Sequence, residues 1–248
     1  MAKVVDMNEE IKKAVNTAQR AQRNYDLSKS IPQEDLDTLI HVATNSPSKQ
    51  NETHYALHVY TDQHKIREIY NQTKLFSLIK DETDFDNVFK EENGEFWQSE
   101  DLSVHNSQIL SNALFVYSVD HGRARGGNSN IAQTTSDTNT ESVKIYNEQI
   151  DFSIGISVGQ LILSATILGY KTGLCSAFPK PQVRAIINSK YNVKLLVGIG
   201  FENTGVDRKL HAETLNKELP TKFQNGAPDE KWKFPSFEKN IKVIINGS

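Results

Sequence analysis

The sequence has little of what builds covalent or metal-based frameworks. Cys175 is the single cysteine in 248 residues, so an internal disulfide cannot form. His54 and His58 could share one face of a strand, but no cysteine or carboxylate cluster completes a ligand set and no HExxH motif occurs. We therefore predict no metal site. Because a nucleophilic cysteine needs a base beside it, we expect Cys175 to behave as a small buried apolar side chain.

An excess of either charge is also missing. Lys and Arg total 28 against 31 Asp and Glu, so the formal net charge is −3 and no basic footprint for nucleic acid is present. The first 25 residues carry Asp6, Glu9 and Glu10 where a secretory signal would need an apolar core. These absences predict a cytoplasmic protein with no nucleic-acid partner.

Glycine-rich phosphate loops are absent as well. No GxxxxGK[ST] motif occurs, and the segment from Gly198 to Gly205 has Asn203 where a dinucleotide fingerprint needs its third glycine. We expect a strand end followed by a turn at this place. Any nucleotide must be held by other groups.

Residues 152–170 form the one long uncharged run, of 19 residues. Serine, threonine, glutamine and three glycines lower its hydropathy and no basic flank follows, so we expect a buried helix of a soluble protein and no membrane partner. Gly155 and Gly159 lie four residues apart and would let another helix approach closely. A subunit interface along this helix is one explanation and a central core helix is the other.

Hydrophobic periodicity predicts a single domain of mixed class. The order of the elements does not alternate as a parallel doubly wound sheet would, so an α+β layer is favoured. We expect a capping box at residues 30–33 to begin the second helix. The predicted helices are 6–24, 33–45, 141–169 and 181–189, and the predicted strands are 55–60, 113–119, 171–178, 194–201 and 242–245.

Two insertions and a tail have the composition of loops. Residues 81–101 carry nine acidic residues against Lys90 alone, with aromatics between them, and residues 121–142 are rich in Gly, Asn, Ser and Thr. Loops of this length are functional lids or disordered segments. Residues 212–248 contain three prolines and end in an alternating pattern. We predict that this arm crosses to a second copy of the chain and pairs with its sheet.

Two polar segments could bind an anion. Arg20 and Arg23 lie three residues apart at the end of the first helix, where guanidiniums either donate to a phosphate or complement the helix terminus. Pro47 ends the second helix, and Ser48 and Asn51 follow it with hydroxyl and amide donors. An ordinary polar loop is the other interpretation of residues 45–51.

Taken together, these segments resemble the FMN-dependent nitroreductase family from Gln19 to about His211. Residues 19–25 are similar to the family's RRSxRxF motif, with Arg20 and Arg23 matching and Gln19 and Ala21 departing. Pro47, Ser48 and Asn51 match its PSxxN loop, although Thr53-His54-Tyr55 follows in place of the usual Gln-Pro-Trp.

Further segments extend the resemblance. Residues 155–169 are similar to the family's interface helix, and Asn106 and Gln108 lie in a segment like the one that reaches the flavin pyrimidine ring. Cys175, Ser176 and Ala177 occupy the loop that passes the flavin N5 edge in relatives. Arg208 and Lys209 resemble a basic pair that helps bind the FMN phosphate.

The resemblance implies a nitroreductase-like fold, with a mostly antiparallel central sheet flanked by helices, in an intertwined homodimer with two FMN sites at its interface. It implies ping-pong reduction of nitroaromatics, quinones or similar acceptors by NADPH or NADH, with the chemistry at flavin N5 and no catalytic acid or base from the protein. Two alternatives stay open. The scaffold could support reductive dehalogenation or flavin destruction, or the chain could be a non-catalytic flavin-binding or structural dimer.

Overall fold

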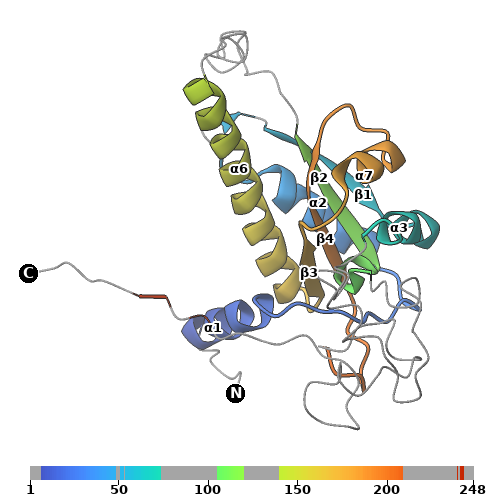
Figure 1. Ribbon diagram of the computed structural model, residues 1–248. Helices are drawn as coiled ribbons and strands as arrows, with labels where there is room; N and C mark the ends of the chain where they lie inside the picture. Colours follow the sequence, from blue (N-terminus) through green and yellow to red (C-terminus); the bar gives the residue numbers. More distant parts are fainter. Residues whose placement is uncertain are drawn as a thin grey trace, which may run out of the picture.

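The computed structural model describes residues 7–48, 51–52, 54–73, 105–119, 140–208, 239 and 241–242. In these residues a four-stranded sheet forms with the order β1-β2-β4-β3, and each neighbouring pair is antiparallel (Figure 1). This confirms the α+β class and the antiparallel sheet. The strands are β1 (Tyr55–Tyr60), β2 (Ala113–Val119), β3 (Lys171–Cys175) and β4 (Val193–Gly200).

Helices cover both faces of this sheet, with α6 on one side and α3 and α7 on the other (Figure 1). Alternate residues of β2 explain the two layers. Phe115 and Tyr117 pack with α2 and α6, whereas Leu114 and Val116 pack with α3 and α7. The described helices are α1 (Met7–Ala18), α2 (Gln33–Thr44), α3 (Gln63–Tyr70), the 3₁₀ turn η2 (Ser107–Ile109), α6 (Thr140–Ile167) and α7 (Lys180–Ile186).

The predicted first helix is too long. Helix α1 ends at Ala18, because the backbone beyond it pairs with strands instead of continuing the helix. Ala21 forms a parallel bridge with Thr172, and Tyr25 forms an antiparallel bridge with Glu202. The predicted capping box is also wrong, since Pro32 is the N-cap of α2, with φ −56°, and no side chain caps that end.

The prediction that the uncharged helix is buried on all sides is wrong for the single chain. One face of α6 is buried in the core, but Phe152 is 67% exposed, Ile156 44% and Ile167 68%. In the described part of the chain, residues 147–167 are the one helix long and apolar enough to cross a membrane, with a mean hydropathy of 1.6 and 44% of it buried. Its packing against the sheet makes it a core helix with an uncovered apolar face.

The other boundaries lie close to the predicted ones. Strands β1 and β2 have the predicted bounds, and β4 ends at Gly200 before a turn at Thr204 and Gly205, as expected from the broken fingerprint. The insertion 81–101, most of 121–142 and residues 243–245 of the predicted strand 242–245 lie outside the described residues. The exchange of the arm between two copies stays a prediction.

Candidate functional site

The segment after α1 is extended and lies against the ends of two strands. Gln22 N donates to Thr172 O at 2.8 Å, which holds the segment beside β3. Asn24 Nδ2 donates to Asp207 O at 2.7 Å, and Arg208 Nη1 donates to Ala21 O at 3.2 Å. These bonds join residues 21–24 to the chain after β4 and so bring the segments of Arg23 and Arg208 together.

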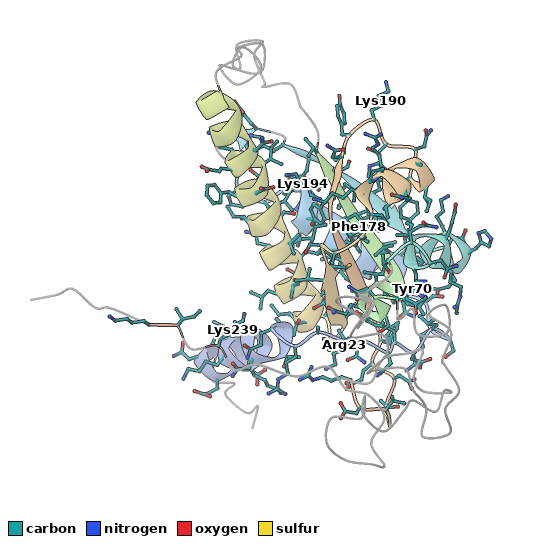
Figure 2. All side chains as sticks on the ribbon, in the orientation of Figure 1. Arg23, Tyr70, Phe178, Lys190, Lys194 and Lys239 are labelled. Atoms are coloured by element: carbon teal, nitrogen blue, oxygen red, sulfur yellow. The ribbon has the colours of Figure 1, made fainter. Side chains whose placement is uncertain are left out.

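Arg23 and Arg208 form a pair of like charges, which we call the arginine pair. The pKa of Arg23 is lowered to about 10, first by burial and then by the charge of Arg208, while the neighbouring Tyr25 opposes the shift. Arg23 lies just beyond the end of α1 (Figure 2). A bound phosphate would relieve both the repulsion and the loss of hydration, so the pair suits an anion. Arg20 is exposed, and Lys209 lies outside the described residues.

Two glycines let the turn η2 lie directly on β3 and β4. A Cβ at Gly198 would lie 2.2 Å from Gln108 O, and a Cβ at Gly173 would lie 2.6 Å from the same atom. Side chains are excluded at both positions, so the backbone of Gln108 can touch the strands. Gln108 Oε1 accepts a hydrogen bond from Leu174 N at 3.2 Å, which leaves the amide NH₂ group as the donor for a ligand.

Tyr25 connects the arginine pair to Gln108. Its buried hydroxyl donates to Gln108 O at 3.1 Å and lies 3.4 Å from Gly198 O. Burial raises the pKa of Tyr25 far above its ordinary value, so the hydroxyl keeps its proton and remains a donor. Sequence reasoning did not select Tyr25, Gly173 or Gly198 as functional positions. A sequence signal for Gly173 and Gly198 did exist, because a glycine inside a predicted strand often marks a place where another backbone approaches closely.

Cys175 is a buried structural thiol beside this site. It is 2% exposed, its Sγ donates to Ala177 O at 3.4 Å, and burial raises its pKa against the opposing hydrogen bond with Asn106. This confirms the prediction of a small buried side chain. These contacts bring together four predicted site residues, Asn106, Gln108, Cys175 and Ala177. Ser176 and Ala177 are exposed to solvent.

Ser48 and Asn51 lie far from the arginine pair. Ser48 Oγ donates to Glu52 O at 2.7 Å, and the loop 47–51 is joined through His54 to Ser153, in the middle of α6. The arginine pair instead adjoins the start of β3, beyond the far end of α6. At 1.5 Å per helical residue, the part of α6 from Ser153 to Ile167 is about 20 Å long, and it separates Ser48 and Asn51 from the arginine pair. One chain therefore does not bring Ser48 and Asn51 to the arginine pair.

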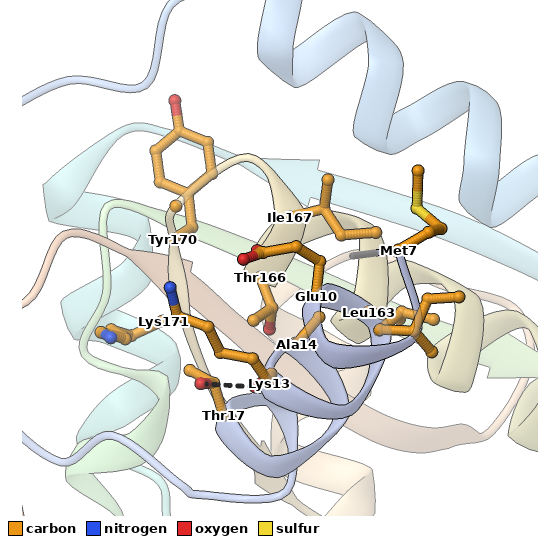
Figure 3. A pocket seen from close by; sticks show the side chains of 12 residues that line it. Met7, Glu10, Lys13, Ala14, Thr17, Leu163, Thr166, Ile167, Tyr170 and Lys171 are labelled. Atoms are coloured by element: carbon orange, nitrogen blue, oxygen red, sulfur yellow. Dashed lines mark hydrogen bonds between the residues drawn. The ribbon is translucent and has the colours of Figure 1, made fainter. Parts of the chain in front are cut away.

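A cavity of about 460 Å³ opens between α1 and the C-terminal end of α6 (Figure 3). Apolar side chains of Met7, Ile11 and Ile167 line it, and Lys13 and Lys171 contribute charge. None of the predicted site residues lines it. Helix α1 buries no residue of its own, so its apolar side and that of α6 are both uncovered in the single chain.

Comparisons with known proteins agree on one family. The family model described as "Nitroreductase family" matches residues 17–201. A search of the curated proteins found no match. Three solved structures share the fold at 16–17% identity. One from Exiguobacterium sibiricum, described as a nitroreductase in complex with FMN, has 16% identity and a TM-score of 0.54, covering 84% of this chain and 93% of that chain.

The other two structures are similar to the same extent. A nitroreductase with bound FMN from Bacteroides fragilis has 17% identity and a TM-score of 0.53, covering 80% of this chain and 91% of that chain. A protein described as an NAD(P)H:FMN oxidoreductase from Staphylococcus epidermidis has 16% identity and a TM-score of 0.52, covering 88% and 100%.

Proposed function

Because this chain belongs to the nitroreductase family, we propose that it is an FMN-dependent oxidoreductase that uses NADPH or NADH to reduce nitroaromatic, quinone or similar small acceptors. The observation that carries the proposal is the arginine pair. Two guanidiniums, one of them with a pKa lowered by burial and by the other, form a receptor for one terminal phosphate. The FMN-bound relatives support the choice of FMN. The protein would be soluble and cytoplasmic.

The chain's own residues would bind and orient the flavin. Arg23 and Arg208 would donate to the phosphate and the Gln108 amide would bind the pyrimidine ring, while buried Asn106, whose Oδ1 accepts from Gln108 N at 3.1 Å, would hold Gln108 in place. The backbone of residues 175–177 would adjoin the flavin, and Ser176 and Ala177 are exposed, so they would not close the slot to a substrate. FMN, when bound, supplies the redox chemistry, and the protein contributes fixed donors and a shaped slot.

A homodimer would complete each site. The loop 47–51 of one chain is too far from its own arginine pair, so a second copy must supply Ser48 and Asn51. The uncovered apolar faces support this assembly, because Met7 and Ile11 on α1 and Phe152 and Ile156 on α6 are all more than 40% exposed. Exposed apolar surfaces of this kind mark association sites.

Ping-pong kinetics is expected, since one slot must take the nicotinamide and then the acceptor. The test is to release the bound cofactor for mass spectrometry and then measure initial rates with menadione and with a nitroaromatic at several concentrations of NADPH or NADH. We expect FMN, oxidation of the dinucleotide, and parallel double-reciprocal lines. A colourless protein that takes up no FMN would overturn the proposal, and intersecting lines would overturn the shared slot.

A further inference from the structure

A buried chain of polar side chains connects the loop 47–51 to α6. His54 Nδ1 lies 2.9 Å from Ser153 Oγ, and His54 Nε2 lies 3.5 Å from the carboxylate of Glu52. His54 is 1% exposed and Ser153 is 2% exposed. His54 stands where the family motif usually has proline, so this connection comes from a departure of this sequence.

The chain of contacts Ser153–His54–Glu52 resembles the catalytic triad of a hydrolase, but its geometry argues against that chemistry. Ser153 is buried in the middle of a helix, and its hydroxyl also lies 2.8 Å from Gln149 O, four residues earlier. A nucleophile needs access to its substrate, and this hydroxyl has almost none. When Ser153 donates to Gln149 O, His54 Nδ1 must donate to Ser153 Oγ, because a hydroxyl has a single hydrogen.

The loop itself is held by few bonds among its described residues. Ser48 Oγ donates to Glu52 O at 2.7 Å, and Asn51 N donates to Ser48 O at 3.2 Å. Asn51 has φ 57°, in the left-handed region that costs free energy for a residue with a side chain. Asparagine tolerates this conformation better than most residues, and the ion pair of Glu52 with protonated His54 adds a restraint from outside the turn.

We propose that His54 is a positioning residue that fixes Ser48 and Asn51, the two polar residues assigned above to FMN. In the imidazolium form both ring nitrogens carry a proton: Nδ1 donates to Ser153 on α6, and Nε2 forms an ion pair at 3.5 Å with Glu52, which is hydrogen-bonded to Ser48 and adjoins Asn51. The part that concerns FMN rests on the proposed function. The restraint on the loop is a property of the chain without cofactor.

Two substitutions with side chains of different length test the roles of the two ring nitrogens of His54 separately. His54→Gln can place an N–H near the position of Nε2 and keep the contact with Glu52, whereas His54→Asn reaches only the position of Nδ1 and keeps the contact with Ser153. The matched control is His58→Gln on β1, because His58 Nε2 also meets a serine hydroxyl, Ser118 Oγ at 3.1 Å.

Two measurements are made on each variant. Hydrogen exchange of the peptide covering residues 47–55 in the FMN-free protein reports the restraint, and FMN titration reports its consequence. We expect His54→Asn and His54→Ala to speed exchange of the Asn51 amide and to weaken FMN binding about 10-fold. We expect His54→Gln to stay within about 3-fold of the original protein in both measurements. The His58→Gln control should change neither.

Equal behaviour of His54→Gln and His54→Asn would overturn the proposal, since a general packing role does not distinguish the two nitrogens. If His54→Ala fails to fold, the comparison of the Gln and Asn variants still decides. An original protein that takes up no FMN would overturn the proposed function alone, because the exchange measurement still tests the restraint.

Discussion

Arg23→Gln should stabilise the FMN-free protein while weakening its affinity for FMN. The pKa of Arg23 is lowered to about 10, so the folded state disfavours the charged form of this side chain. The pKa falls from 12.5 to about 10, so at 1.36 kcal/mol per pKa unit the penalty is at most about 3.4 kcal/mol. Solvent screening of a partly exposed group reduces this to about 1–2 kcal/mol. Glutamine is uncharged, so the variant should gain that amount.

The pH dependence of this gain follows from the difference between the Arg23 pKa in the folded and in the unfolded chain. A base whose pKa is lower in the folded than in the unfolded chain costs stability at every pH below the folded value, and the cost disappears as pH rises beyond it. The gain from Arg23→Gln should therefore be constant between pH 6 and 8. It should shrink only above about pH 10. Losing charge-assisted hydrogen bonds worth about 1.5–3 kcal/mol should weaken FMN binding about 10- to 100-fold.

The assay is urea unfolding of the FMN-free proteins at pH 7, in low and high salt, together with FMN titration. Salt screens the repulsion from Arg208, so the gain should be smaller in high salt. Arg184→Gln on α7 is the matched control, because Arg184 is exposed, and its change should stay within about 0.5 kcal/mol. The reasoning fails if Arg23→Gln lowers stability by more than about 1 kcal/mol or leaves FMN affinity unchanged.

Two further substitutions and one labelling measurement test packing, assembly and reactivity. Gly198→Ala should destabilise the protein by about 1–3 kcal/mol in urea unfolding, because its Cβ would lie 2.2 Å from a backbone oxygen; unchanged stability would contradict the close contact with Gln108. Ile156→Asp should convert the proposed dimer to monomers in sedimentation, because a buried unpaired charge costs about 3–5 kcal/mol; a dimer that persists would remove α6 from the interface. Cys175, 2% exposed and with a raised pKa, should react with a thiol reagent only after urea unfolding, so rapid labelling of the native protein would contradict its burial.

Local composition determined most of the secondary structure. Strand β2 is buried over all of Ala113–Val119 because both of its faces are covered, and its run of apolar and aromatic residues, interrupted only by Ser118, gives its bounds from the sequence directly. The absence of a glycine loop likewise pointed to arginines as the phosphate receptor. These properties depend on neighbouring residues, so periodicity and residue type are sufficient to find them.

Tertiary structure decided what distant segments do to one another. The end of α1 at Ala18 depends on hydrogen bonding to Thr172, and the position of Arg208 depends on a bond to a residue 187 positions away. No local pattern contains either contact. The sequence also could not show that one face of α6 is exposed. An uncharged helix has the same composition whether a sheet, a second chain or both cover it. Only the folded chain distinguishes the face packed on the sheet from the face left exposed.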